Sequence, residues 1–535
     1  MHHRGCDNPA IAGPANRVAR RRAAGVVAVC LVVVSAYGAW AQSSGAPGTA
    51  SSELLPDAAI APLLVRGAEL FKKNWSPEQG GGRRVTKGTG RPVSDPSWPL
   101  AGARSFNRVS APDAGSCAGC HNAPHGIVGG SGDFVTNVFL LGQRFDFMTF
   151  DPADALTTRG TVDETGTPAT LSEAANIRAT TGMFGAGYLE MLARQMTAEL
   201  QAVRGSITHG ETKALVAKGV HFGVLTLTKD GVWDTSKVQG LGRLSLISTG
   251  TINPPTLIVR PWHQASNVVS LREFTNTSFN HHHGIQSTER FGLGTDPDGD
   301  AVRNEMTRDE VTAVTLFQAT LQVPGRVIPS HPAVEKAVLI GEQTFERIGC
   351  ATCHIPRLPL DRQGWVFVEP NPYNPAGNLR GGEVPDVRLD LTSAVLPAPR
   401  LRPDATGTVW VDAYTDFKLH NICEPGEEEA LDMNQAQWSA RLHDGNCRFL
   451  TKRLWGAANE PPFFHHGLFT TLRQSVLAHS GEAKASRLAF QALPKYEQDS
   501  LIEFLKTLQV LPPGTTARVV DERRQPRTWP PVGAR

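Results

Sequence analysis

The stretches "CAGCH" at residues 117–121 and "CATCH" at residues 350–354 decide how this chain is organised. We call them the first and the second motif. Each places two cysteines three positions apart, with a histidine directly after the second cysteine. This spacing is the attachment signature of c-type haem, because two thiols on one turn bond the two vinyl groups while the adjacent histidine binds the iron. The sequence therefore predicts two covalently bound haem c groups.

Two other uses of paired cysteines fit the spacing less well. A zinc ribbon brings its cysteine pairs within about 15–20 residues of each other, whereas the two motifs lie in opposite halves of the chain. A thioredoxin-type redox pair needs no histidine after it and sits in a β-α-β pattern, which is not seen here. The predicted haem-binding residues are therefore Cys117, Cys120, His121, Cys350, Cys353 and His354.

The segment before the second motif predicts a helix. Its apolar residues recur at near-helical spacing, and Gly341 and Phe345 lie one turn apart just before the motif. Residues 496–508 predict a C-terminal helix that crosses it, with the glycine allowing close approach. Gly67 and Phe71 repeat the spacing ahead of the first motif, although a Gly- and Pro-rich insertion follows them. This is the helix arrangement of cytochrome c.

The expected fold class is mainly α, with two cytochrome c-type haem domains, long loops and a small β-hairpin insertion in the first domain. The chain of 535 residues contains 52 glycines and 38 prolines, which favours long loops. Residues 187–205 predict an amphipathic helix. Residues 220–234 predict the hairpin, with Asp230-Gly231 at its turn.

The N-terminus predicts an export signal. A cluster of arginines precedes an apolar run that ends at Ala39-Trp40-Ala41, a small-x-small cleavage site. A permanent membrane anchor is the alternative, because the run is near the minimum length that spans a bilayer. We expect cleavage, and hence a periplasmic protein without a stable membrane span. The predicted segments are a signal peptide (1–41), a flexible linker (42–57), an N-terminal haem domain (58–325), a C-terminal haem domain (332–512) and a tail (513–535).

Charge argues against one class of partner. The chain has 53 Lys and Arg against 51 Asp and Glu, a formal net charge of +2. Proteins that bind nucleic acid through their overall field carry a much larger positive excess. We therefore expect no nucleic-acid partner.

Two cysteines, Cys423 and Cys447, remain outside the motifs and the signal segment. In an oxidising compartment such a pair most simply forms a disulfide. A pair of free thiols is the alternative.

Residues 274–292, "FTNTSFNHHHGIQSTERFG", gather side chains suited to the distal side of a haem. Cleaving a peroxide O–O bond needs a base that moves the proton and a polar or cationic group that stabilises the departing oxygen. The candidate catalytic residues are His282, His283, Glu289 and Arg290. The alternative is that the adjacent histidines are surface polar residues or hydrogen-bond donors outside the pocket.

An acidic loop follows this segment. Asp296, Asp298 and Asp300 stand at alternate positions, as in a calcium-binding loop. Ala301 replaces the turn glycine of the EF-hand pattern, and Thr307 stands where its bidentate glutamate belongs. The loop is therefore a candidate calcium site, and a solvated acidic turn is the alternative.

Four stretches resemble the bacterial di-haem cytochrome c peroxidase superfamily, and more closely its branch of di-haem oxidoreductases. They are "RSFNRVSAPDAGSCAGCHNAP", "SLREFTNTSFNHHHGIQSTERFG", "FERIGCATCHIP" and "LWGAANEPPFFHHGLFTTLRQSVLAHSGEA". The resemblance implies two cytochrome c domains, an N-terminal haem that reacts with peroxide and a C-terminal haem that relays electrons to it. It also implies a calcium ion near the domain interface.

The resemblance also implies a sixth ligand for the second haem. In the peroxidases a "HDG" or "HSG" turn is followed by a methionine ligand 14 residues after the turn's histidine. The turn here is His465-His466-Gly467, and the corresponding position is His479. An all-nitrogen ligand set lowers the haem potential relative to Met/His ligation. The alternative is a surface His479 and a different sixth ligand.

The expected function is that of a di-haem oxidoreductase of the peroxidase type, reducing hydrogen peroxide at the first haem with electrons relayed by the second. The expected electron donor is a small redox protein or an organic molecule. Two alternatives stay open. One is an electron-transfer di-haem cytochrome c without substrate turnover, and the other is a di-haem oxygenase or oxidase acting on an external organic or protein substrate.

Overall fold

The structure of the protein is a computed structural model, which describes residues 53–81, 114–122, 124–130, 138–141, 175–250, 253–296, 300–424 and 447–531. The predicted signal peptide (1–41), most of the predicted linker and Asp298 lie outside these residues. Among the segments described, no helix is long and apolar enough to cross a membrane.

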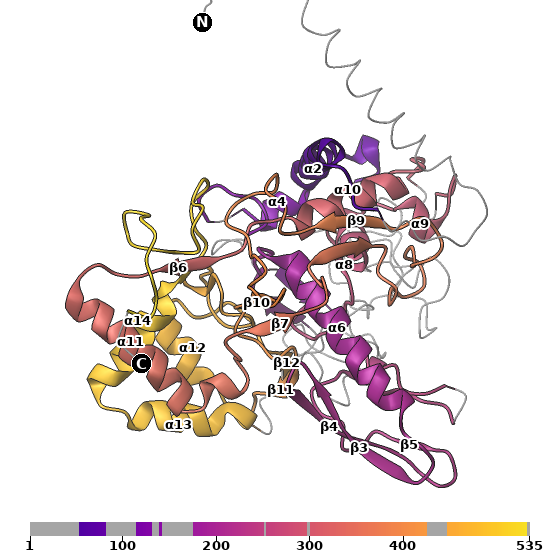
Figure 1. Ribbon diagram of the computed structural model, residues 1–535. Helices are drawn as coiled ribbons and strands as arrows, with labels where there is room; N and C mark the ends of the chain where they lie inside the picture. The colour runs from indigo at the N-terminus through magenta and orange to yellow at the C-terminus, as the bar shows by residue number, and fades with distance from the viewer. Residues whose placement is uncertain are drawn as a thin grey trace, which may run out of the picture. The chain divides into compact units, whose positions relative to one another are not determined.

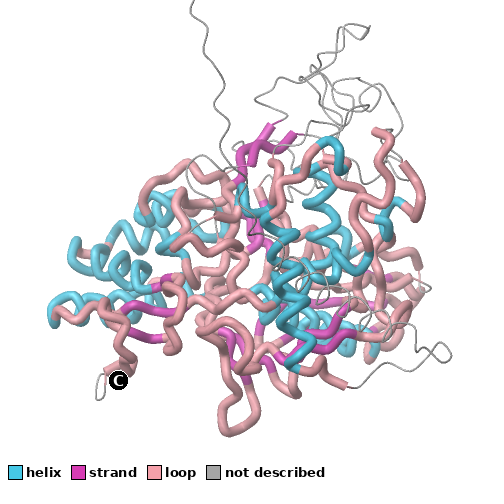
Figure 2. The backbone as a smooth tube through the Cα atoms, turned by 90° about the horizontal axis from the view of Figure 1, so that it is seen from above, coloured by secondary structure: helices cyan, strands magenta, loops and turns pink. Residues whose placement is uncertain are grey.

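The expected fold class was wrong. Of the described residues, 35% are helical and 15% lie in strands, so the fold is mixed rather than mainly α. The strands are two to eight residues long and pair within several small sheets. Figure 2 shows them as short pieces scattered among loops and helices. Runs as short as "VFVE" (366–369) or "VWV" (409–411) are too brief to show a period, so the sequence does not predict them as strands.

Five helices of twelve or more residues form the framework (Figure 1): α2 (Asp57–Lys72), α6 (Ala186–Gly205), α10 (Arg308–Ala319), α11 (Pro332–Arg347) and α14 (Lys495–Thr507). The shorter helices are α4 (Cys117–Cys120), α7 (Arg243–Leu246), α8 (Leu271–Ser278), α9 (Thr288–Phe291), α12 (Leu472–Ala478) and α13 (Lys484–Ala492). These bounds include the three helices that the sequence predicted.

The sheets have two or three strands each. The predicted hairpin is present as β4 (Val220–Leu227) and β5 (Trp233–Asp234), with Gly231 at a positive φ of 79° in the turn, and β3 (Glu211–Ala217) adds a third strand. The remaining sheets are β1 (Val138–Leu141) with β2 (Ala175–Arg178), β7 (Leu358–Leu360) with β10 (Val409–Val411), β8 (Val366–Glu369) with β9 (Val387–Asp390), β11 (Leu419–Asn421) with β12 (Arg448–Leu450), and β6 (Gly325–Val327) between β13 (Leu508–Gln509) and β14 (Val519–Val520).

The expected helix crossing is present, and it occurs twice. Helix α11 packs on α14 and α2 packs on α10, as Figure 1 shows. A Cβ added to Gly341 would overlap the backbone oxygen of Ser500, and one added to Gly67 would overlap that of Ala313. Each glycine is therefore the point where two helix backbones touch, because any larger residue would push the helices apart.

Aromatic residues line both crossings in the same way. The rings of Phe345 and Phe504 lie 5.4 Å apart at 63°, and those of Phe71 and Phe317 lie 5.3 Å apart at 59°. The partner helix α10 was not predicted, although it ends in "FQATL" as α14 ends in "FLKTL". The two helix pairs are thus a structural repeat, each placed beside one motif.

The hydrophobic core extends across the boundary between the two predicted haem domains (58–325 and 332–512). The larger cluster joins Phe71 and Leu192 to Leu389 and Val510, which come from both sides of that boundary. A smaller cluster surrounds Phe345 between α11 and α14. The division into two haem domains stays a prediction.

Candidate functional site

The first motif forms a single capped turn. The Ser116 hydroxyl accepts a hydrogen bond from the Gly119 N–H at 3.1 Å, which starts the turn α4 that carries both cysteines. The His121 ring then lies with Nδ1 2.9 Å from the Gly130 carbonyl oxygen. Because a carbonyl only accepts, Nδ1 carries the proton and Nε2 is left with its lone pair, as a metal ligand requires.

The second motif repeats this arrangement. His354 Nδ1 lies 3.2 Å from the Tyr414 carbonyl oxygen, so its Nε2 is also the nitrogen without a proton. The Phe345 ring lies 6.3 Å from the His354 ring at 49°, and Phe71 lies 6.0 Å from His121 at 50°. The two motifs, far apart in the sequence, therefore each place their imidazole beside an equivalent phenylalanine.

The motif side chains are in the protonation states that haem attachment and iron binding need. Burial lowers the pKa of His121 and of His354 to about 4, so both imidazoles are neutral at pH 7. Burial raises the pKa of Cys117 and of Cys350 to about 12, so both thiols are neutral in apolar surroundings. None of the motif cysteines forms a disulfide in the described chain. These residues fit an apolar, covalently attached macrocycle.

A second imidazole faces His354. The ring centres of His354 and His479 lie 6.3 Å apart at 64°. His479 ends helix α12, and its Nδ1 donates to the Ser475 carbonyl at 2.7 Å, which leaves Nε2 as the possible ligand. Two imidazoles that bind one metal ion through Nε2 at about 2.0 Å each hold their ring centres roughly 6 Å apart. The spacing of the pair therefore fits one shared iron.

The first motif opens on a cavity instead. Its empty space is about 1340 Å³, including space open to solvent. The wall mixes apolar, aromatic and polar side chains from both halves of the chain. The lining includes Phe71, Cys117, Cys120, His121, Arg178, Met183, Leu189, His263, Phe274, His282, His283, Thr415, Phe417, Lys452 and Arg453. A cavity lined by two thiols, an imidazole and apolar side chains fits a haem.

Two of the four candidate catalytic residues lie at this cavity. His282 and His283 line it together with His121. His283 Nδ1 donates to the Ala114 carbonyl at 2.8 Å, and its Nε2 lies 3.4 Å from Cys117 Sγ. His283 is thus held against Cys117 of the first motif, and His282 lines the same cavity.

The other two candidates, Glu289 and Arg290, are not among the residues that line the cavity. Glu289 forms a buried ion pair with Arg272 at 2.5 Å and accepts a hydrogen bond from Asn276. Arg290 Nη2 donates to Asn378 Oδ1 at 2.9 Å. Both side chains hold the segment that carries the histidines onto its neighbours.

Glu369 belongs to the same buried network. Its Oε1 lies 3.0 Å from Arg272 Nη1, while its Oε2 has no hydrogen-bond partner among the described residues. Burial is the main cause that raises the pKa of Glu369 to about 7 from its ordinary value of 4.5, against the opposing charge of Arg272. The folded protein therefore keeps a proton on Glu369 that the unfolded chain releases.

This proton predicts a stability that falls with pH. Between pH 4.5 and about 7 the folded state binds one proton more than the unfolded state, so the free energy of unfolding should fall by roughly 3 kcal/mol. Glu369→Gln should remove this part of the decline, as measured by urea unfolding at pH 5 and pH 7.5. Glu383→Gln, at an exposed position, is the control and should keep it. An unchanged slope in Glu369→Gln would contradict the assignment.

The hydrogen bonds within the acidic loop do not test the calcium prediction. Asp296 accepts hydrogen bonds from the Asp300 and Ala301 N–H groups, and Asp300 accepts one from Val302. These bonds are those of an acidic turn. Since Asp298 lies outside the described residues, calcium binding stays a prediction.

The structure joins Cys423 and Cys447 by a disulfide, with their Cα atoms 5.4 Å apart. The two cysteines lie next to the paired strands β11 and β12. The bridge therefore ties the ends of residues 425–446, which are not described.

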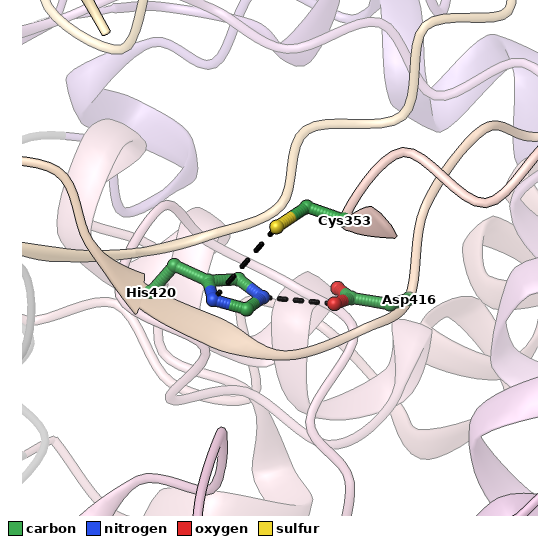
Figure 3. A group of neighbouring side chains, drawn as sticks. All are labelled: Cys353, Asp416 and His420. Carbon is green, nitrogen blue, oxygen red and sulfur yellow. Dashed lines mark hydrogen bonds and ion pairs between the residues drawn. The ribbon is translucent and has the colours of Figure 1, made fainter. Parts of the chain in front are cut away.

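One group beside the second motif was not predicted from the sequence. His420 lies between Asp416, at 2.8 Å from Nε2, and Glu482, at 2.7 Å from Nδ1. Cys353 Sγ lies 4.0 Å from Nδ1 (Figure 3). Burial would lower the pKa of His420, but hydrogen bonds to Asp416, Cys353 and Glu482 outweigh it and raise the pKa to about 11.

Cys353, Asp416 and His420 are close enough to hold a metal ion. Both ring nitrogens of His420 donate to carboxylates, however, and Cys353 belongs to the second motif. We therefore regard the group as a fixed imidazolium beside the second motif. Only an Asp416/His420 spacing of four residues could have indicated it, and that spacing is common.

One family model matches part of the chain. Residues 404–508 match the model of a family described as di-haem oxidoreductase, putative peroxidase. The resemblance predicted from the sequence is confirmed. The matched residues include Tyr414, His420 and His479, and the family implies haem cofactors.

Other comparisons add little. No curated protein matches the chain. A chain of the Kuenenia stuttgartiensis hydrazine synthase, in a structure pressurised with xenon, is 12% identical and covers 87% of this chain and 98% of its own. Its TM-score of 0.30 is too low to establish a common fold.

Proposed function

We propose that this protein is a periplasmic di-haem c-type oxidoreductase that reduces hydrogen peroxide at the first motif with electrons relayed through the second. One observation carries the proposal. Both motifs hold their histidine in the same way, but the second has another imidazole 6.3 Å away, whereas the first opens on a cavity. A site with two protein ligands mostly transfers electrons, and a site with one has a position for substrate.

The chain would hold each haem by residues of the same types. The two cysteines of each motif would form the thioether bonds, His121 would bind the first iron, and His354 and His479 would bind the second. Bound in this way, haem supplies the one-electron chemistry that the side chains lack. The hydrogen bonds to Gly130 and Tyr414 would keep both proximal rings in the required tautomer.

The residues at the cavity would manage protons. Reduction of one hydrogen peroxide consumes two electrons and two protons and releases two waters. We assign the proton transfer to His282, because its imidazole lines the cavity beside His121. Glu289 and Arg290 would act by positioning the histidine segment. The electrons would come from a small redox protein or an organic donor.

The test uses the purified protein with both haems attached. We expect the ferric protein to contain one high-spin haem, and stoichiometric hydrogen peroxide to change its spectrum within the mixing time. A spectrum that is entirely low-spin and unmoved by peroxide would refute the peroxidase assignment and favour an electron-transfer cytochrome.

The location and processing belong to the proposal as well. Cleavage after Ala41 would release a mature protein into the periplasm, where covalent haem attachment and the disulfide are both compatible with the compartment. N-terminal sequencing of the protein from a periplasmic extract should begin at Gln42. A protein that keeps its first 41 residues and stays with the membrane would contradict this.

The second haem also has a test of its own. His479→Met should raise the midpoint potential of one haem by at least about 59 mV, a tenfold change for a one-electron couple, because Met/His ligation favours the ferrous state. The potential of the other haem should stay nearly constant. Redox titration followed by absorbance measures both, and His466→Met is the control from the neighbouring turn. An unchanged pair of potentials would refute the ligand assignment.

A further inference from the structure

The cavity of the first motif has a one-sided charge. Its lining includes the basic side chains Arg178, Lys452 and Arg453, and no aspartate or glutamate is among the described lining residues. Two of the three come from residues 447–531, whereas the motif comes from the N-terminal half. The cavity is therefore a place where a negative group would be attracted.

The three basic side chains differ in how they are compensated. Lys452 Nζ forms an ion pair with Glu460 at 3.1 Å. The Arg178 guanidinium lies 5.3 Å from the centre of the Phe449 ring, and the residue is only 4% exposed. Arg453 makes no hydrogen bond or ion pair with the described residues, and the carboxylate that attracts it, Glu460, already binds Lys452.

A partly buried guanidinium without a counter-ion is costly, because it has lost hydration and gained no partner. Arg binds carboxylates strongly and with two parallel hydrogen bonds. A ligand that fits this cavity would therefore combine an apolar body, for the wall of Phe71, Met183 and Leu189, with carboxylates for the basic rim. Haem is such a molecule, since its flat apolar ring carries two propionates.

Arg453 also shares its cavity with the first motif. Its side chain lines the same cavity as Cys117 and His121. The cation and the motif histidine therefore border the same space.

We propose that Arg178 and Arg453 bind the propionate carboxylates of the haem at the first motif. The inference deepens the proposed function and rests on it for the presence of that haem. The assignment has a structural consequence. Arg453 follows Thr451, whose carbonyl accepts a hydrogen bond from the Thr415 hydroxyl. It precedes Leu454, which packs in the cluster around the second motif. The first haem would thus join the N-terminal motif to the segment beside the second one.

The test replaces the charge and measures potentials. In Arg453→Met the midpoint potential of one haem should fall by about 59 mV, which is a tenfold change in its ferrous–ferric equilibrium constant. The reason is that a nearby cation favours the less positive ferrous state. The other haem should not shift. Arg453→Lys keeps the charge and should lose less than half of the effect. Arg204→Met, whose guanidinium binds the Pro255 carbonyl away from the cavity, is the control and should change neither potential.

The alternative ligand for these arginines is a carboxylate that is not part of haem, and benzoate serves as the probe for it. If propionates occupy the arginines, benzoate should leave the spectrum of the wild-type protein unchanged. Saturable benzoate binding that is lost in Arg453→Met, with both potentials constant, would overturn the propionate assignment. Constant potentials without benzoate binding would overturn it too.

The measurement does not depend on peroxide. A protein that shows the shift in potential but does not react with peroxide would contradict the proposed function and leave this inference standing. Should Arg453→Met fail to fold or to carry two haems, Arg453→Gln and Arg453→Lys give the same comparison with smaller changes in side-chain shape.

Discussion

Replacing Cys117 and Cys120 by serine is expected to leave a protein with one covalent haem and no reaction with hydrogen peroxide. Serine cannot form the thioether bond, so His121 alone would have to hold the first haem. The haem that stays, between His354 and His479, has no position for peroxide, because two imidazoles face each other there at 6.3 Å. The mass of the intact protein and the rate of peroxide consumption measure both effects.

Two further variants make this result specific. Replacing Cys350 and Cys353 should also remove one haem, but the spectrum that remains should be the one that peroxide changes. Replacing Cys423 and Cys447 removes the disulfide and should leave both haems in place. If the first variant keeps two covalent haems or still consumes peroxide at the wild-type rate, the roles of the two motifs are assigned wrongly.

The second large effect is expected at a glycine far from any reacting atom. Gly341→Ala should destabilise the protein by about 2–3 kcal/mol, because the new methyl group overlaps the Ser500 backbone and forces α11 away from α14. Alanine is otherwise a better helix former than glycine, so the sign of the effect comes from packing alone. Urea unfolding followed by the absorbance of the second haem measures it.

The same substitution elsewhere provides the matched controls. Gly205→Ala at the end of α6 meets nothing within 4 Å and should be neutral or slightly stabilising. Gly67→Ala should destabilise as much as Gly341→Ala, because it overlaps the Ala313 backbone at the equivalent crossing. Equal stability of Gly341→Ala and Gly205→Ala would show that the helices have room to separate.

Much of the structure near the motifs could be predicted from the sequence. Helices α11 and α14 and the hairpin β4–β5 have periods or turn residues that local reasoning detects. The mixed character of the fold could not be predicted in this way. Strands such as β7, β10 and β12 have three residues each and are stabilised by pairing with strands distant in the chain.

The candidate site divides in the same way. The motif histidines follow from spacing, and His479 follows from its distance to the His465 turn in a related family. The helix α10 was missed even though its last turn repeats that of α14, because a repeat of a few residues is a weak signal without a known partner. Arg453 carried no signal at all, since its meaning depends on the cavity around it.

The sequence by itself determined the covalent chemistry that we propose for this protein. Two cysteines and a histidine must lie within one turn to attach and bind a haem, and one turn is a property of five consecutive residues. The tertiary structure alone showed that the first motif faces a cavity with a basic rim, and it placed the imidazole of His479 opposite His354. Those environments are built from residues hundreds of positions apart, and only the packing of the helices and loops brings them together.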